Sequence, residues 1–205
     1  MSAPDTPYQV RRTPTQFRAT RQIERILDAA ARVVVDKGFS AATTADIAKT
    51  AKVSIGSVYR YFPDKLAVMR AVVERNTLRY QDRVTAEAAV LPVWHEAVAR
   101  AYSIYVGMCR TDEGFRAISN AGLAAGELDS NEFDDPLADG LADVLVDRFG
   151  FIDTAELRVT LLQAVTIGDV LTRLAFRLDP TGHEDTLAKT AAMVHELIAV
   201  HAPSR

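Results

Sequence analysis

The chain has one cysteine, Cys109, among its 205 residues, so a disulfide within the chain is excluded. A lone thiol is typical of proteins from a reducing compartment. No apolar run approaches the roughly 20 residues that cross a bilayer, and residues 1–16 lack the apolar core of a secretion signal. We therefore expect a cytoplasmic protein without a membrane partner.

The usual signatures of catalysis and cofactor binding are also lacking. No glycine-rich phosphate loop precedes a helix, and the histidines are scattered without metal-ligand spacing. The sequence around Cys109 offers no activating partner, so we interpret this thiol as a small core residue. The carboxylates of residues 127–135 are interpreted as a solvated acidic patch. An enzyme, a metal site and a cofactor are therefore all disfavoured. The histidines are His95, His183, His195 and His201.

Sustained strand-like alternation is missing as well, and no internal repeat is visible. Apolar residues instead recur at helical spacing, as Ile23, Ile26 and Ala30 do before Gly38 ends the first helix. We predict an all-α fold. Expected helices cover about residues 16–37, 65 onward, 92–110, 112–122, 136–149, 154–178 and 184–200, with a polar loop at 126–135 and Pro136 starting the helix that follows it.

Charge is unevenly distributed along the chain, whose net charge is −3. Residues 1–65 hold eleven Lys and Arg against six Asp and Glu, a charge of +5, whereas residues 66–205 hold thirteen against twenty-one, a charge of −8. A basic first part on an acidic remainder is typical of a DNA-binding module attached to a body that does not bind DNA.

The most specific stretch is TTADIAKTAKVSIGSVYRYF, residues 43–62. Thr43 or Thr44 can cap a first short helix, and Lys52 and Val53 form a tight turn. Ser54 then caps a second helix, expected at about residues 55–61. Two short helices joined by such a turn are the layout of a DNA-reading helix-turn-helix.

Side-chain chemistry assigns roles within this motif. Ile55, Gly56 and Ser57 are expected to meet base edges, with Ile55 suited to a thymine methyl group. Arg60 can read guanine or bind phosphate, and the sequence leaves both open. The hydroxyls and amides of the remaining residues, with nearby basic side chains, are expected at phosphates. These predicted phosphate contacts are Thr43, Thr44, Ser54, Tyr59, Tyr61, Lys65, Arg18 and Arg21.

Residues from about 20 to 73 resemble the N-terminal domain of the TetR (tetracycline repressor) family of transcriptional regulators. The matching pieces are ILDAAARVVVDKGFSAATTADIA and VSIGSVYRYFPDKLAV, and the run VYRYFPDK has the family's spacing of aromatics, proline and lysine. Lys52 departs from the family, which usually has glycine in the turn. The resemblance implies a flexible basic arm at 1–15, a helix-turn-helix DNA-binding domain at 16–65 and a larger helical ligand-binding and dimerisation domain at 66–205.

The resemblance also implies a homodimer that binds a palindromic operator and is released by an unidentified small molecule. Repression is the default expectation, because a protein on DNA can block polymerase. The family typically dimerises through its last two long helices, and apolar residues there are candidates for the dimer interface: Val159, Leu162, Val170, Leu187, Val194 and Ile198. Candidates for the walls of the ligand pocket, each also open to interpretation as core, are Trp94, Tyr102, Tyr105, Met108 and Phe115.

One alternative stays open at this point: a helix-turn-helix protein that binds DNA without any ligand. Such a protein would have no sizeable cavity in its body.

Overall fold

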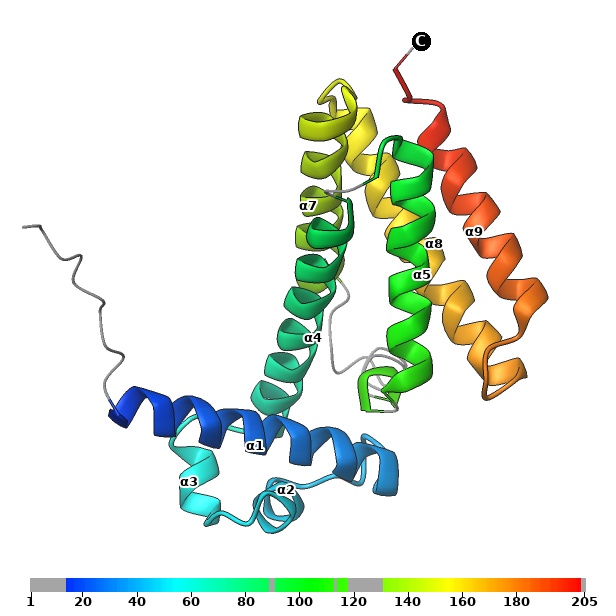
Figure 1. Cartoon of the computed structure of the whole chain (residues 1–205). Coiled ribbons are helices and arrows are strands. Elements are labelled where there is room, and N and C mark those ends of the chain that lie inside the picture. The colour runs from blue at the N-terminus through cyan, green and yellow to red at the C-terminus, as the bar shows by residue number, and fades with distance from the viewer. Residues whose placement is uncertain (1–13, 89–90, 113, 118–130, 204–205) are drawn as a thin grey trace, which may run out of the picture.

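In the computed structural model, which describes residues 14–88, 91–112, 114–117 and 131–203, every regular element is a helix (Figure 1). The predicted all-α fold is thus confirmed. Helices α1 (Pro14–Lys37), α2 (Thr44–Ala51) and α3 (Ile55–Tyr59) form a small head. The basic arm predicted at residues 1–15, including Arg11 and Arg12, lies almost entirely outside the described residues.

The head is held together by one apolar cluster to which four helices contribute. Ile26 of α1, Ile47 of α2, Val58 of α3 and Met69 of α4 (Lys65–Ala88) are all fully buried in it. Burying a side chain of this size stabilises a fold by about 1.5–3 kcal/mol. Because α4 supplies part of this core, the first turns of α4 belong physically to the head, although the predicted boundary lies at residue 65.

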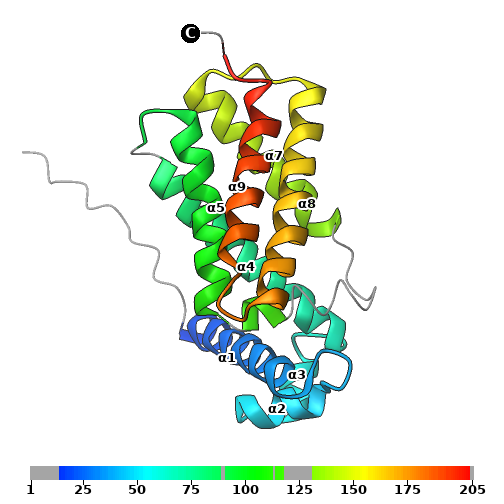
Figure 2. The same cartoon turned by 90° about the vertical axis from the view of Figure 1, so that its right-hand side faces the viewer.

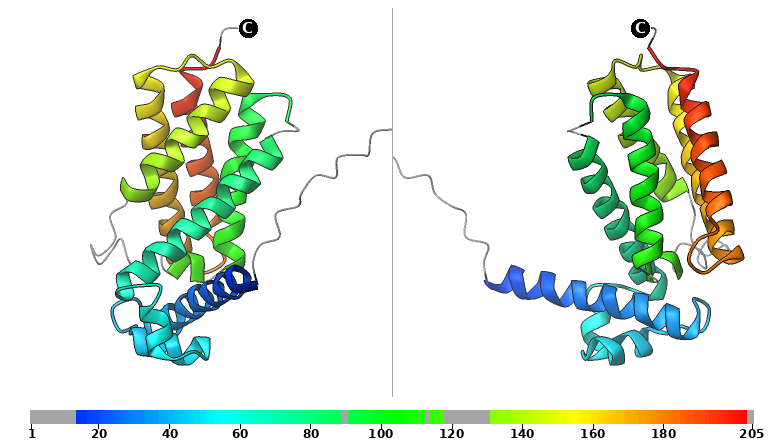
Figure 3. Two further views of the ribbon diagram at one scale, coloured as in Figure 1. Left: turned by 90° about the vertical axis from the view of Figure 1, so that its left-hand side faces the viewer. Right: turned by 45° about the vertical axis from the view of Figure 1, so that its right-hand side comes forward.

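The body is a helical bundle, and α4 connects it to the head (Figure 1). Helix α4 packs against α1 at one end and against α5 and α7 farther along. Helices α8 and α9 lie side by side on the face of the bundle shown in Figure 2, and the two views of Figure 3 show the head at one end of the bundle. The body helices are α5 (Trp94–Thr111), α7 (Asn131–Phe149), α8 (Ala155–Leu178) and α9 (Glu184–Ala199).

Local signals explain most helix ends. Thr154 caps α8 by accepting a hydrogen bond from Leu157 N at 3.1 Å, and Asp64 accepts one from Ala67 N at 2.8 Å at the start of α4. Gly38, which follows α1, has φ of +82°, a conformation that glycine adopts without strain. Each of these ends was expected from the sequence.

The start of α7 corrects the sequence-based expectation. The helix begins at Asn131, so residues 131–135 are helical and Pro136 lies inside the helix. Pro136 is the sixth residue of α7, so its missing N–H removes one backbone hydrogen bond of the helix and its ring crowds the carbonyl four residues earlier. The carboxylates that precede it suit the positive end of the helix dipole. Residues 114–117 are helical, as expected for the short helix, and residues 118–122 and 126–130 of the predicted elements lie outside the described residues.

Among the described residues, α8 alone is long and apolar enough to cross a membrane by length and composition. This finding differs from the expectation that no apolar run is that long. The helix packs against α7 and α9, and about one third of its most apolar window is buried inside the chain. An apolar helix that is covered on one side only calls for a further partner on its other side.

Candidate DNA interface and internal cavity

The two short helices of the head are fixed by reciprocal capping. Thr43 Oγ1 accepts a hydrogen bond from Asp46 N at 3.1 Å, and Ser54 Oγ accepts one from Ser57 N at 3.1 Å. Lys37 lies 2.5 Å from the Asp46 carboxylate, and this hydrogen bond, with one from Thr43, lowers the pKa of Asp46. The contacts hold α2 against the end of α1 and set the start of α3.

Lys52 forms the turn in a left-handed conformation, with φ of 55° and ψ of 47°. Among the residues that the structure describes, it is the one non-glycine residue with positive φ. Its N–H bonds back to Lys49 O at 3.1 Å, and Val53 N bonds to Ala48 O at 3.0 Å. Arg25 of α1 donates to Ala51 O at 2.6 Å, which ties the turn to the head. The left-handed conformation of a non-glycine residue stores backbone strain at this turn.

Replacing this lysine with glycine is expected to stabilise the protein. Lys52→Gly relieves a left-handed strain of about 1–2 kcal/mol but adds chain entropy to the unfolded state, about 0.4–1 kcal/mol. We expect a net gain of about 0.5–1 kcal/mol in the free energy of unfolding, measured by urea denaturation. Lys49→Gly, at an exposed position inside α2, is the control and should lose about 1 kcal/mol. A loss in Lys52→Gly would show that the turn is not strained.

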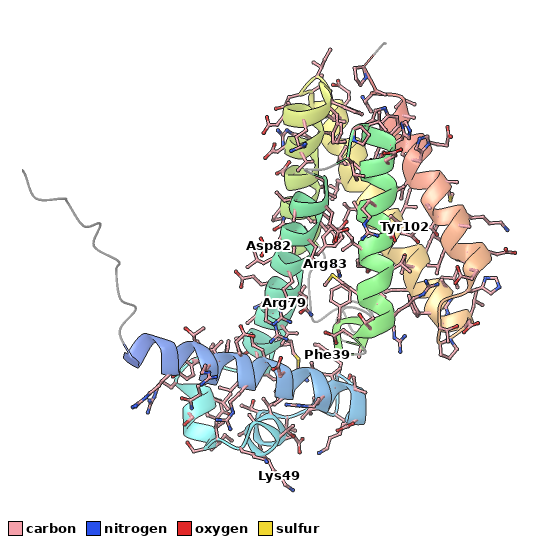
Figure 4. All side chains as sticks on the ribbon, viewed as in Figure 1. Phe39, Lys49, Arg79, Asp82, Arg83 and Tyr102 are labelled. Atoms are coloured by element: carbon pink, nitrogen blue, oxygen red, sulfur yellow. The ribbon has the colours of Figure 1, made fainter. Side chains whose placement is uncertain are left out.

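The surface of the head that faces away from the body carries most of the predicted DNA contacts. Ile55 is 46% exposed and Tyr59 is 52% exposed, although both are large apolar or aromatic side chains. In Figure 4 the side chain of Lys49 projects from the head on the side opposite the body. A Cβ at Gly56 would meet only Ser54 Oγ at 4.0 Å, so this helix start is open to a close-approaching surface. The predicted contacts that are exposed are Arg18, Arg21, Thr43, Ser54, Ile55, Gly56, Tyr59 and Arg60.

The other four predicted contacts are buried or half-buried in the head. Thr44 is buried. Ser57 Oγ is 2.9 Å from Ser54 Oγ, and Tyr61 Oη lies 3.5 Å from Gln22 Oε1. Lys65 donates to Phe39 O at 3.2 Å and lies over the Phe39 ring. For Thr44, Tyr61 and Lys65, these interactions give the side chain a structural role, and their contribution to DNA binding stays a prediction.

The body encloses a cavity of about 160 Å³ between α4, α5, α7, α8 and α9. Of the five aromatic and methionine candidates, Tyr102, Tyr105 and Phe115 line it. Most other lining residues are aliphatic, such as Leu141 and Leu161. A cavity of this size holds a small apolar molecule, since an engineered cavity of about 150 Å³ takes up benzene.

Trp94 and Met108 do not line the cavity, which corrects their assignment as pocket walls. The Trp94 ring stacks on His195 with centroids 5.1 Å apart and meets Phe151 edge-on. Met108 packs against buried clusters that contain Ile104 and Cys109. Both are core residues. Burial raises the pKa of Cys109 to about 12, which fits the inert thiol expected from the sequence.

Two carboxylates line the end of the cavity nearer the head. Tyr105 Oη donates to Asp169 Oδ1 at 2.6 Å, and Arg173 Nη1 lies 2.6 Å from Asp169 Oδ2. Burial and the neighbouring Asp169 raise the pKa of Tyr105, so this hydroxyl stays a neutral donor. Burial, with a smaller contribution from Asp169, raises the pKa of Asp134 to about 6.

Sequence reasoning missed both carboxylates as cavity residues. Asp134 was assigned to a solvated patch because the acidic segment was interpreted as a loop. Once α7 starts at Asn131, Asp134 falls on the same face as Leu137, Leu141 and Leu145, all of which line the cavity. The helical spacing of Asp134, Leu137, Leu141 and Leu145 is the sequence signal that could have identified Asp134. It is overlooked when Pro136 is taken as the first residue of the helix.

Because the pKa of Asp134 is raised, the free energy of unfolding is expected to depend on pH. The folded state holds this proton more tightly than the unfolded state, so the wild type loses stability as pH rises from about 4 through about 6. Asp134→Asn avoids that loss. We expect it to be about 1–3 kcal/mol more stable than wild type at pH 7.5 and nearly equal at about pH 3.5, below both pKa values, in urea denaturation. The exposed neighbour change Asp135→Asn is the control, and an identical gain at both pH values would contradict the assignment.

Residues 114–117 touch both the head and the cavity. A Cβ on Gly114 would lie 2.5 Å from Ala31 Cβ of α1, so the backbone passes against the head where a larger residue does not fit. Ala117 packs on the head core, and Phe115 lines the cavity. Arg75 of α4 also bonds to Asp28 of α1 at 2.8 Å. The cavity wall and the head are thus in direct contact.

The outer faces of α8 and α9 carry exposed apolar side chains. Val159 and Val170 are about half exposed, as is Met193 of α9. Leu162 is partly buried against the body. Leu187, Val194 and Ile198 are buried inside the chain, which corrects their assignment to a dimer interface: their stripe of α9 faces α5 and α8, and the opposite stripe is exposed.

Among the described residues, no group of three His, Cys, Asp or Glu side chains is arranged to hold a metal ion. The site is therefore defined by a three-helix head that exposes the start of α3 and by a helical body with an apolar cavity. This combination defines a helix-turn-helix protein whose body contains an apolar cavity.

Comparison with known proteins identifies the same class of protein. Residues 26–72 match the family of bacterial regulatory proteins called the tetR family. A TetR-family transcriptional regulator from Streptomyces coelicolor is 31% identical, with a TM-score of 0.76 over 88% of this chain and 99% of that chain. The transcriptional regulator FadR from Bacillus subtilis, solved in complex with stearoyl-CoA, is 17% identical, with a TM-score of 0.68 over 86% of this chain and 97% of that one.

Curated relatives match less than half of the chain. The HTH-type transcriptional regulator SrpR of Pseudomonas putida is 36% identical over 88 residues, which are 43% of this chain and 40% of SrpR. TtgW of Pseudomonas putida is 35% identical over 88 residues, 43% of this chain and 64% of TtgW. The chain thus spans less than two thirds of these relatives. The chain belongs to the TetR family, whose matched members are transcriptional regulators and not enzymes.

Proposed function

We propose that this protein is an effector-responsive transcriptional repressor that binds a palindromic operator as a homodimer. The observation that carries the proposal is the exposed surface of α3, with Ile55, Gly56 and Tyr59 open to a partner on a head whose own core is complete. Because its target is DNA, the regulator acts in the cytoplasm.

Dimerisation is supported by the uncovered side of α8. Val159 and Val170 expose about half of their surface on the outer face of α8, and Met193 of α9 is equally exposed. Two such helices from each chain can form a four-helix interface around a two-fold axis. A two-fold dimer places two heads on one side of the DNA, which matches a palindromic site with half-sites about one helical turn apart.

Release by an effector is supported by the cavity and by the segment beside it. Phe115 lines the cavity while Gly114, its neighbour in sequence, packs on Ala31 of the head. A ligand that binds more tightly when this segment has moved would shift the heads away from the DNA-bound arrangement. The cavity argues against the alternative of a helix-turn-helix protein without a ligand.

Selection of bound sequences from random DNA tests the proposal. The experiment uses the purified full chain at about 0.15 M salt, where charge alone gives only weak binding. We expect enrichment of one sequence with two-fold symmetry. Folded protein that enriches an asymmetric sequence, or none, would contradict the proposal.

A further inference from the structure

We propose that the effector is a small, mainly apolar molecule with one positively charged nitrogen, which binds beside Asp134 at the end of the cavity nearer the head. The inference rests on the proposed role of the cavity as the effector site and specifies the chemistry of its ligand.

The charge of the cavity is the first observation. Asp134 and Asp169 are the acidic residues in its lining, and no lysine, arginine or histidine lines it among the described residues. Asp169 is already compensated by Arg173, whose Nη1 lies 2.6 Å from Asp169 Oδ2. Asp134 forms no hydrogen bond or ion pair with another described side chain. Arg173 also acts on Asp134, so one cation faces two carboxylates, and the group keeps one net negative charge for a ligand to neutralise.

The hydroxyl groups of the cavity are the second observation. Tyr105 donates its proton to Asp169, and Tyr80 donates to Ala101 O at 3.2 Å. Tyr102 Oη pairs with Thr172 Oγ1 at 2.9 Å. The tyrosine hydroxyls are thus engaged with protein partners, while the Asp134 carboxylate can only accept when ionised. A ligand that donates hydrogen bonds fits this end, and one that brings a second anion is repelled.

Aromatic rings also line the cavity, and one of them, Tyr105, bonds to Asp169. Tyr105 meets Phe115 edge-on at 5.8 Å between centroids and Tyr80 edge-on at 6.1 Å, and all three line the cavity. The faces of aromatic rings attract cations. Carboxylates and ring faces together favour an ammonium group over a neutral donor.

The remaining lining residues indicate the chemistry of the part of the ligand that carries no charge. Away from Asp134, the cavity is lined by aliphatic side chains such as Leu145, Leu161, Val194 and Ile198. A hydrocarbon or aryl group suits these walls, and the volume of about 160 Å³ limits it to a small molecule.

Three probes that share one apolar group and differ in charge test the inference. 3-Phenylpropylamine, 3-phenylpropan-1-ol and 3-phenylpropanoate are cationic, neutral and anionic at pH 7.5, and their binding to the full-length protein is measured by calorimetry. We expect the amine to bind about 10- to 100-fold more tightly than the alcohol, as a hydrogen-bonded charge pair provides, and the carboxylate to bind more weakly than both.

Matched variants locate the effect. In Asp134→Asn the advantage of the amine over the alcohol should fall to about threefold or less, with the affinity for the alcohol retained. In Asp135→Asn, an exposed position outside the cavity lining, the advantage should be unchanged.

Each contrary result has its own meaning. Carboxylate binding as tight as amine binding, or an amine advantage that survives Asp134→Asn, overturns the inference while the cavity keeps its role as an effector site. If none of the three probes binds protein that still binds its selected DNA, the inference fails together with the effector role of the cavity, and the DNA-binding role stands.

Discussion

The double variant Val159→Asp with Val170→Asp is expected to be a folded monomer with at least about 100-fold weaker affinity for a two-fold symmetric operator. Both valines are about half exposed on the outer face of α8, so aspartates there remain solvated in a monomer. In a dimer they would be buried without partners, which costs several kcal/mol. Loss of the dimer removes the advantage of two linked heads, worth about 10²–10⁴ in affinity. Sedimentation velocity and fluorescence anisotropy measure the two effects.

Leu78→Asp is the matched control for this variant. Leu78 is 55% exposed on α4, on the other side of the bundle from α9, so its replacement adds a charge to an exposed apolar position away from the proposed interface. The control should remain dimeric and bind DNA as wild type does. A dimeric double variant, with circular dichroism showing an intact helical fold, would place the dimer interface on another surface.

The second large effect is expected in α3. Tyr59→Ala should weaken binding to every DNA sequence by about tenfold per half-site, because the tyrosine hydroxyl is assigned to a phosphate. Ile55→Ala should instead change which sequence is preferred, since its side chain is assigned to a thymine methyl group. Anisotropy titrations against the preferred duplex and variants with single base changes separate the two outcomes.

The contrast between these two variants is itself the test. If Tyr59→Ala altered the ranking of sequences and Ile55→Ala did not, the helix would lie in the groove in a different orientation from the one proposed. Val35→Ala, at an exposed position of α1, serves as a control and should leave both affinity and ranking unchanged.

Local signals made the head predictable. The caps at Thr43 and Ser54, the turn at Lys52 and the glycine after α1 depend on a few neighbouring residues, and each appears where the sequence placed it. The second short helix ends at Tyr59 rather than at residue 61. The exposed side chains of α3 followed from which apolar residues the head core requires.

Tertiary packing decided what the sequence could not. Helix α9 has apolar residues on two sides, and periodicity alone cannot say which side meets the body and which meets a partner. The structure buries Leu187, Val194 and Ile198 and exposes Met193. Trp94 and Met108 looked like pocket walls for the same reason, since an aromatic or methionine side chain fills a core as readily as it lines a cavity.

The cavity carboxylates illustrate a different limit. Asp134 stands among other acidic residues before a proline, and this composition is typical of a loop. Only the extension of α7 to Asn131 brings it into line with the apolar face of that helix. Its position beside Asp169 depends on the contact between α7 and α8, which no local pattern encodes.

A titration against three duplexes of equal length tests the central claim most directly. One carries the selected symmetric site, one has a single half-site scrambled, and one has both scrambled. The account predicts two chains bound per intact site, weaker binding to the single half-site, and at least about 1000-fold weaker binding to the fully scrambled duplex at about 0.15 M salt. Equal affinity for all three would show that the head binds DNA by charge alone and does not read its sequence.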